Sequence, residues 1–250
     1  RASTRTSGRS RCGPEMARLR AAIVGCGRIA SIFAEDPKRK GVSTHAQAYR
    51  SHPDTGLVAA CDLDEARLEA FGKMWGVKAL YTDFDRMLRE RKPEILSVCT
   101  WNKSHEALVL KAAAAGVRAV ICEKPIADSL AAADRMIRGC RKRGTALLIN
   151  YSRRYNTGHQ RLAREVRRGA IGTVQTVSCY YNAGVMNTGT HLFDELRMFL
   201  GDVKWVWANP DRVLPGTDPS PDIYLQVEGG FGCSVSALEV KEYMQFEIDI

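Results

Sequence analysis

Three short segments of the sequence combine residue types that could carry out hydride transfer with a dinucleotide. Residues 25–30, Gly-Cys-Gly-Arg-Ile-Ala, follow an apolar run, and their glycines allow a turn whose backbone N–H groups can approach a pyrophosphate. Lys124, within Glu-Lys-Pro, ends another apolar run, where an ammonium can stabilise negative charge. His191 can move a proton near neutral pH. Each segment alone is a weak signal, but their order along the chain predicts a dinucleotide-dependent oxidoreductase.

Asp62 strengthens this interpretation because it ends the second strand expected after the glycine turn. A carboxylate there can accept hydrogen bonds from both hydroxyls of the adenosine ribose, and it would repel a 2′-phosphate. We therefore expect NAD rather than NADP. Asp62 lies 35 residues after Gly27 instead of about 20, so residues 35–42 are interpreted as an insertion. Its basic cluster, residues 38–40, either lies near the cofactor phosphates or an anionic substrate, or belongs to a variable surface loop.

Polar residues follow two further expected strands. Residues 100–105, Thr-Trp-Asn-Lys-Ser-His, come after the fourth parallel strand, at the carboxyl edge where open α/β folds bind ligands. Asn102 or Ser104 could equally cap the helix that starts there, and both roles can hold. Lys124 ends the fifth strand, and a cis bond to Pro125 would fix the direction of the lysine. The predicted cofactor-binding residues are Gly25, Cys26, Gly27, Arg28, Ile29, Asp62, Thr100, Asn102, His105, Glu123 and Lys124.

His191 shares a predicted helix face with Asp194, because the helix is expected to start near Thr190 and the two residues are three positions apart. The helix follows a strand of the second domain, which suits a side chain that points across a cleft. Asp194 either orients the imidazole ring or is an early-turn acid favoured by the helix dipole.

The spacing of apolar residues predicts two kinds of sheet. Through residue 150, near-continuous apolar runs alternate with helical patterns, as expected for a parallel sheet covered by helices on both faces. Beyond it, apolar and polar residues alternate between Gly and Pro turns, which favours a mostly antiparallel sheet with one apolar face. The expected fold is α/β: an N-terminal Rossmann doubly wound sheet followed by a C-terminal α+β domain with an open-faced sheet. The expected strands are 20–25, 57–61, 79–81, 95–100, 119–122, 146–149, 173–181, 204–208, 224–227 and 231–238, and the expected helices are 64–75, 105–115, 129–143, 157–168 and 191–200.

We expect three segments along the chain. Residues 1–15 form a disordered or non-native tail, residues 16–150 the dinucleotide-binding domain, and residues 151–250 a substrate and oligomerisation domain. The tail is rich in Arg and Ser and lacks an apolar segment, which excludes a secretory signal and leaves a transit peptide as an alternative. Because the chain begins without Met and ends within a strand-like alternation, we expect a fragment whose second domain is incomplete.

Composition limits the class of protein. With 45% apolar residues the chain can form a packed core, and no apolar stretch approaches the roughly 18 residues of a membrane span. The net charge of +9 is dispersed, four arginines lie in the first fifteen residues, and no basic-aromatic motif appears, so no nucleic-acid partner is expected. Eight cysteines without metal-ligand spacing predict reduced thiols in a cytoplasmic protein and no metal site.

Taken together, these motifs resemble those of the Gfo/Idh/MocA oxidoreductases, from about Met16 to the end of the chain. The resemblance implies a Rossmann domain, a second domain whose sheet makes homo-oligomer contacts, and action on sugars, cyclitols or related polyols with NAD or NADP. It matches Lys124 to the lysine beside the substrate hydroxyl and His191 to the catalytic histidine. Asn187 falls where many members carry an Asp, and residues 151–155 resemble the segment after the sixth strand. The substrate residues so implied are Arg154, Tyr155, Asn187 and His191.

The expected mechanism assigns proton transfer to His191 and charge stabilisation to Lys124. His191 removes the proton of the substrate hydroxyl while the carbinol hydrogen passes as hydride to the nicotinamide, and Lys124 holds the oxygen. Two alternatives remain open: a NAD-dependent glycosidase of related fold, and a catalytically silent NAD-binding regulator. Net production of NADH separates a dehydrogenase from such a glycosidase.

Overall fold

The computed structural model describes residues 18–209, 218–240 and 242–250, so the expected tail at residues 1–15 lies outside the described part. The described chain forms two compact units. The first runs to Cys122 and adds residues 134–148, and the second combines residues 123–133 with residues 149–250. Lys124 therefore belongs to the same unit as His191. The expected domain boundary after residue 150 stays a prediction.

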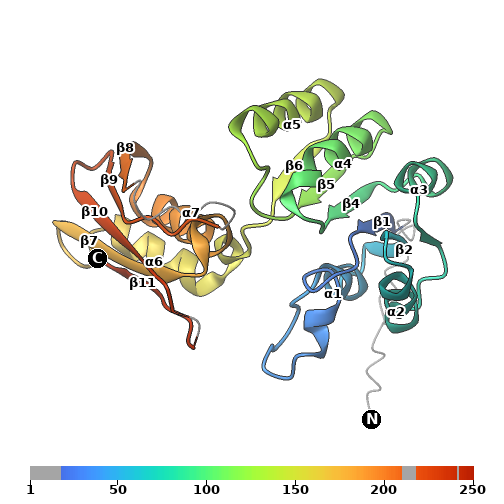
Figure 1. The fold of residues 1–250 in the computed structure, drawn as a ribbon, viewed down its shortest axis with the longest axis horizontal. Coiled ribbons are helices and arrows are strands. Elements are labelled where there is room, and N and C mark those ends of the chain that lie inside the picture. Colours follow the sequence, from blue (N-terminus) through green and yellow to red (C-terminus); the bar gives the residue numbers. More distant parts are fainter. Residues whose placement is uncertain (1–17, 210–217, 241) are drawn as a thin grey trace, which may run out of the picture. The chain divides into compact units, whose positions relative to one another are not determined.

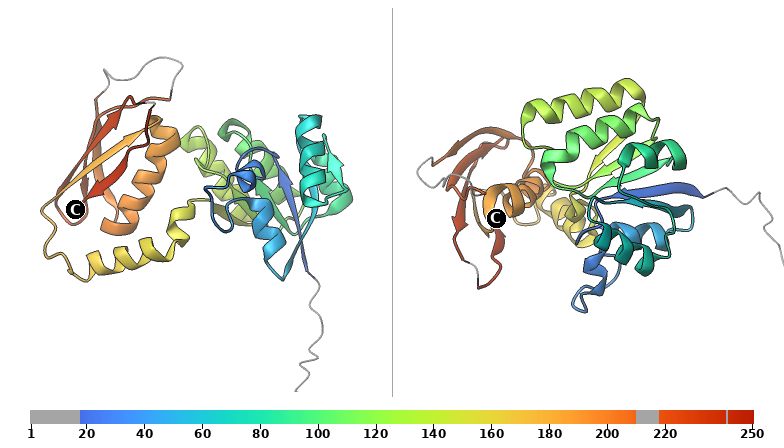
Figure 2. Two further views of the ribbon diagram at one scale, coloured as in Figure 1. Left: turned by 90° about the horizontal axis from the view of Figure 1, so that it is seen from below. Right: turned by 45° about the vertical axis from the view of Figure 1, so that its right-hand side comes forward.

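The first unit is a parallel sheet with helices on both faces, as the apolar runs predicted. Its strand order is β3-β2-β1-β4-β5-β6, and β1 pairs in parallel with both β2 and β4. Helices α1 and α2 cover one face, and α4 and α5 cover the other (Figures 1 and 2). Residues 21–23 of β1 are completely buried, because this central strand is covered on both sides. The elements are β1 (Leu19–Val24), η1 (Ile32–Glu35), α1 (His45–Ser51), β2 (Thr55–Cys61), α2 (Glu65–Trp75), β3 (Leu80–Tyr81), α3 (Phe84–Arg91), β4 (Ile95–Val98), α4 (Asn102–Ala114), β5 (Ala119–Cys122), α5 (Leu130–Arg143) and β6 (Ala146–Ile149).

The chain after the glycine turn does not form one continuous helix. A turn follows Gly27, η1 comes next, and the regular helix α1 starts only at His45. The N–H groups of His45 and Ala46 nevertheless donate to the carbonyls of Ile29 and Ala30, at 3.2 and 3.1 Å. These bonds bring the start of α1 next to the glycine turn, so the segment that leaves and returns, called the insertion below, spans residues 31–44 and is longer than the expected 35–42.

The second unit is a mixed, mostly antiparallel sheet with the order β11-β7-β10-β9-β8. Among the strand pairs described in this second sheet, only β7·β10 is parallel. Alternate residues of β9 and β10 are buried, and they pack against Leu192 and Leu196 of α7. Figure 2 shows α7 (orange) against this sheet. The elements are η2 (Ser152–Tyr155), α6 (Thr157–Arg167), β7 (Thr176–Asn182), η3 (Gly184–Gly189), α7 (Thr190–Leu200), β8 (Val203–Ala208), β9 (Ile223–Val227), β10 (Gly232–Leu238) and β11 (Phe246–Asp249).

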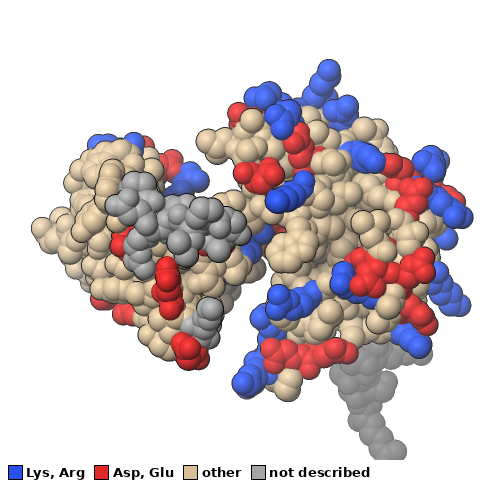
Figure 3. All heavy atoms as spheres, in the orientation of Figure 1, with Lys and Arg blue, Asp and Glu red and all other residues tan. Residues whose placement is uncertain are grey.

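These two sheets confirm the fold class predicted from the sequence, a Rossmann sheet followed by an α+β unit. On the face of the first unit shown in Figure 3, Lys and Arg lie among Asp and Glu rather than in one patch. That pattern is typical of a solvated surface. Within the described residues, no helix is both long and apolar enough to cross a membrane.

Gly25 is where the fold first requires a residue without a side chain. Its φ is +87°, and a Cβ there would lie 2.8 Å from the carbonyl carbon and oxygen of Cys99. The short distances arise because the chain leaving β1 at Gly25 passes close to the chain leaving β4 at Cys99. The glycine is therefore required by the protein itself, before any ligand is considered.

Replacing Gly25 with Ala should destabilise the protein more than the same change at Gly76. Gly76 also has a positive φ, +68°, but a Cβ there would meet nothing within 4 Å. We expect G76A to lower the free energy of unfolding by about 1 kcal/mol and G25A to lower it by more than about 2 kcal/mol. Urea unfolding measures both, and equal losses would contradict the steric argument.

Candidate active site

The glycine turn of the first unit has room for an anion. Whereas Gly25 is enclosed, a Cβ at Gly27 would project into open space. The N–H groups of Gly27, Arg28 and Ile29 donate to no acceptor among the described residues. The space beside Gly27 is open and these donors are unused, so the residues present fit the close approach of a pyrophosphate.

Asp62 lies against this turn. One oxygen of its buried carboxylate accepts the N–H of Cys26 at 2.7 Å, and the other accepts the N–H of Asp64 at 3.0 Å. Arg67 lies 3.6 Å from Asp62 and 3.1 Å from Asp64. A carboxylate oxygen has more than one lone pair, so Asp62 can hold the turn and still accept a hydroxyl.

The segment after β4 is built mainly to hold its own turn. His105 is completely buried, and its Nε2 lies 3.0 Å from the carbonyl oxygen of Thr100. The hydroxyl of Ser104 donates to Thr100 Oγ1 at 2.7 Å. The helix starts at Asn102, earlier than expected, behind Trp101 and without a side-chain cap, so neither Asn102 nor Ser104 caps it. Of the predicted cofactor residues here, His105 acts by positioning the turn, because its burial keeps it from any exposed surface.

Lys124 is held in the second unit by the segment that precedes α7. Its Nζ donates to the backbone oxygen and to the side-chain Oδ1 of Asn187, both at 3.0 Å. The Lys124–Pro125 bond is cis. Burial lowers the pKa of Lys124, and the neighbouring carboxylate of Glu123 opposes this effect. Glu123 is itself buried and accepts a hydrogen bond from Asn150 at 2.7 Å.

Asn187 lies in a π-helical turn, η3, that continues directly into α7. The carboxylate of Asp218 accepts the N–H groups of Met186 and Asn187, at 2.8 and 2.9 Å. Gly184 makes room for this carboxylate, because a Cβ there would overlap Asp218. Single π-turns inside helices are frequent at functional sites. Asp218 thus fixes the residue that holds Lys124, and no feature of the sequence had pointed to it.

His191 is a neutral, largely buried imidazole one helical turn after Asn187. Burial, followed by the cations of Arg153 and Lys124, lowers its pKa from 6.5 to about 4. Its Nδ1 is buried without a partner among the described residues, and the edge of its ring meets Tyr151, with centroids 5.9 Å apart. An imidazole in this state can accept a proton at neutral pH.

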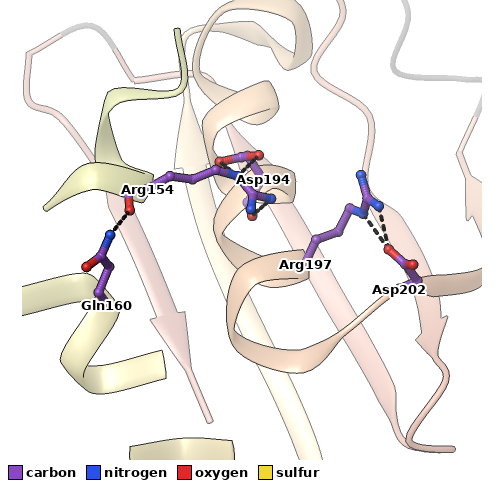
Figure 4. Close-up of polar contacts among 5 residues, drawn as sticks. All are labelled: Arg154, Gln160, Asp194, Arg197 and Asp202. Carbon is purple, nitrogen blue, oxygen red and sulfur yellow. Dashed lines mark hydrogen bonds and ion pairs between the residues drawn. The ribbon is translucent and has the colours of Figure 1, made fainter. Parts of the chain in front are cut away.

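Arg154 and Asp194 are paired with each other. The Nε of Arg154 donates to both carboxylate oxygens of Asp194, at 2.6 and 2.8 Å, and the backbone oxygen of Arg154 accepts from Gln160 (Figure 4). Neither expected role of Asp194 accounts for its contacts, since the carboxylate ties η2 to α7. Arg154 uses its Nε and Nη2 in contacts with Asp194, and its predicted contact with substrate stays a prediction. Tyr155, predicted alongside it, is 59% exposed.

Arg153, rather than Arg154, is the arginine close enough to act on the two central residues. It lowers the pKa of both Lys124 and His191, and its Nε lies 3.0 Å from the buried carboxylate of Glu195. Its guanidinium also lies 4.3 Å above the ring of Phe246. Sequence reasoning missed Arg153 because two adjacent arginines look alike until the 3₁₀ turn η2 points them in different directions.

The chemistry available is therefore divided between the units. The first carries a turn with free N–H donors and an adjacent carboxylate. The second carries a neutral imidazole and an ammonium that has one N–H left after its two bonds to Asn187. A proton acceptor beside a cationic donor suits the removal of a proton from a hydroxyl.

Comparisons with known proteins agree on the class of protein. A family model described as "Oxidoreductase family, NAD-binding Rossmann fold" matches residues 19–151. D-apiose dehydrogenase of Paraburkholderia graminis is 32% identical over 90% of this chain and 63% of its own length. D-glucoside 3-dehydrogenase of Escherichia coli is 32% identical over 72% of this chain and 48% of its own length. The chain thus spans about half to two thirds of these two relatives.

A solved structure gives the same result in three dimensions. The crystal structure of an oxidoreductase from Agrobacterium radiobacter, in complex with NAD+, L-tartaric acid and magnesium, is 26% identical. It superposes with a TM-score of 0.77 over 93% of this chain and 71% of that chain.

The partly buried position of the Arg154–Asp194 pair predicts a larger loss on mutation than a surface pair gives. Asp194 is 11% exposed, whereas the Arg197–Asp202 pair (Figure 4) is more than half exposed on both sides. Arg154→Gln leaves the largely covered carboxylate of Asp194 without its partner and should lower the free energy of unfolding by about 2–3 kcal/mol. Arg197→Gln should cost less than about 1 kcal/mol. Urea unfolding of the two variants tests this, and similar losses would argue against it.

The lowered pKa of His191 predicts that stability falls as the pH falls from 7 to 5. Between 6.5 and about 4 the unfolded imidazole binds a proton that the folded one does not, so acid favours unfolding. Since the side chain is partly accessible, the effect should be about 1–2 kcal/mol. His191→Gln has no imidazole to titrate at this position. The difference in unfolding free energy between wild type and this variant should therefore change by about 1–2 kcal/mol between pH 7 and pH 5. A pH-independent difference would mean that His191 is not desolvated.

Proposed function

The chain belongs to the Gfo/Idh/MocA family of oxidoreductases, and from that premise we propose that it transfers a hydride between NAD and the hydroxyl-bearing carbon of a sugar, cyclitol or related polyol. The named relatives support this substrate class, since one is a D-apiose dehydrogenase and another a D-glucoside 3-dehydrogenase. The observation that carries the proposal is the grouping of Lys124, Asn187 and a neutral His191 in one unit.

His191 takes the proton of the substrate hydroxyl in the proposed reaction. Its low pKa keeps the ring unprotonated, so it needs no prior deprotonation at neutral pH. Lys124 uses its remaining N–H to hold the substrate oxygen, and its charge stabilises the negative charge that develops there. Asn187 aims the ammonium, and Asp218 in turn holds Asn187. Bound NAD would supply the hydride acceptor.

The turn at residues 25–30 and the carboxylate of Asp62 would hold the dinucleotide. Asp62 supports NAD over NADP because a 2′-phosphate would face its negative charge. The nearby Arg67 offers little compensation, since both Asp62 and Asp64 already neutralise its guanidinium. We therefore expect tighter binding of NAD than of NADP.

The second unit also has features of an assembly surface. Trp205, Trp207 and Tyr224 are each more than half exposed on β8 and β9. Exposed aromatic clusters on a sheet are typical of protein contacts. Assembly of the full-length protein as a homo-oligomer through this sheet stays a prediction.

The test is turnover and NAD binding in matched histidine variants. His191→Gln should reduce turnover on a responsive polyol about 10²–10⁴-fold, because it removes the base. NAD affinity should stay unchanged, since the proposed dinucleotide contacts lie elsewhere. His52→Gln, at an exposed histidine that ends α1, serves as the control and should retain full turnover.

The readout is the absorbance of reduced nicotinamide, with a panel of sugars and cyclitols as substrates. Unchanged turnover in His191→Gln would remove His191 from the mechanism. Cleavage of a glycoside without net NADH would favour the NAD-dependent glycosidase, and NAD binding without any turnover would favour a silent regulator.

A further inference from the structure

The insertion at residues 31–44 is attached to the glycine turn by backbone hydrogen bonds. Its first residues are bonded back to the turn: the N–H of Ser31 donates to Gly27 and that of Phe33 to Arg28, both at 3.0 Å. At its far end the chain rejoins the same helix at His45, bonded to Ile29. The base of the insertion is therefore fixed to the residues that we propose bind the dinucleotide.

Two arginines share one aromatic ring at this base. The guanidinium carbon of Arg39 lies 3.8 Å from the ring centroid of Phe33, and that of Arg28 lies 5.9 Å from the same centroid. Ser43 fixes the backbone here, because its hydroxyl donates to the carbonyl of Phe33 at 3.3 Å. A cation over an aromatic face gains a favourable electrostatic interaction. Phe33 thus serves as a platform that brings Arg39 of the insertion toward Arg28 of the glycine turn.

The positive charges at this platform are only partly balanced by the protein. Asp36 lies 3.5 Å from the Nε of Arg39, at the weak end of ion pairing, and both side chains are about two-fifths exposed. Among the described residues, no carboxylate lies within ion-pair distance of Arg28. Both arginines are exposed. Two gathered guanidiniums beside free backbone N–H donors create a local excess of positive potential that an anion would relieve.

We propose that Arg39, held over Phe33 beside Arg28, binds the pyrophosphate of the dinucleotide, so that the insertion is part of the cofactor site. This rests on the proposed function, because it needs the dinucleotide to lie at the glycine turn. A guanidinium presents paired N–H donors that match two phosphate oxygens, which suits a diphosphate better than a single lysine does. Within the described part of the chain, neither Lys38 nor Lys40 makes a cation–π contact with Phe33, and both are exposed neighbours of Arg39.

The experiment measures the dissociation constants of NAD and of ADP-ribose by calorimetry, at low and high salt. Arg39→Gln should weaken both roughly tenfold, because one charge-assisted contact to phosphate is lost. Lys40→Gln removes the same charge one residue away and should change affinity less than about twofold. Phe33→Leu keeps every charge but removes the platform, so it should lose an intermediate amount.

The outcomes separate this proposal from the proposed function. If wild type binds NAD while Arg39→Gln and Lys40→Gln bind it equally, the insertion is a solvated loop and the proposal fails alone. If Arg39→Gln leaves NAD affinity unchanged but raises the KM of an anionic substrate, Arg39 serves the substrate and the proposal also fails. If wild type binds neither NAD nor ADP-ribose, both this proposal and the proposed function fail. A tenfold loss confined to Arg39→Gln, which shrinks at high salt, supports it.

Discussion

The ammonium of Lys124 bonded to Asn187 is the contact on which the second unit's site depends. It joins residues 63 positions apart in sequence, and it links the end of β5 to the turn that starts α7. Because the ammonium reaches both the backbone and the side-chain oxygen of one residue, a shift of η3 would move Lys124 as well. Asp218 prevents such a shift by accepting two consecutive N–H groups of that turn. The site is therefore held from both directions by polar contacts.

Burial adjusts the electrostatics of this site more than any single partner does. For both Lys124 and His191, desolvation is the largest cause of the pKa shift, and it favours the uncharged form in each case. The cation of Arg153 acts in the same direction on both. Two carboxylates partly offset the positive charge: Glu195 lies 3.0 Å from Arg153, and Glu123 acts to raise the pKa of Lys124. The result is a neutral base placed near positive charge, which suits proton removal from a hydroxyl.

Much of the architecture could be predicted because buried strands and helix faces appear in the sequence as runs or regular repeats of apolar residues. The strands of the first sheet read as apolar runs since both faces are covered, and the start of α7 near Thr190 followed from its glycine entry. Helix α3 was not predicted, because only Phe84, Met87 and Leu88 face the core in an otherwise charged segment. An interruption after the first helical turn was expected at residues 35–42, but its extent was not, since the hydrogen bond between His45 and Ile29 cannot be recognised from local periodicity.

Individual side-chain roles were harder to predict than elements. The roles suggested for Arg154 and Asp194 ignored their attraction to each other, which depends on how η2 meets α7. Asp218 is distant in sequence from the turn that it holds, so no spacing rule could have found it. Pairings of this kind depend on tertiary structure, whereas apolar strand runs and helix ends can be recognised from residues that are neighbours in the sequence.

The break in the first helix between Ala30 and His45 has a consequence for how this protein can vary. Hydrogen bonds join Ile29 and Ala30 to the first turn of α1, although residues 31–44 lie between them in the chain. The excursion can then be lengthened or shortened while the glycine turn keeps its hydrogen bonds to His45 and Ala46. A designer could graft a reporter peptide at the apex, near Gly41, where the backbone is exposed and a side chain would meet nothing within 4 Å.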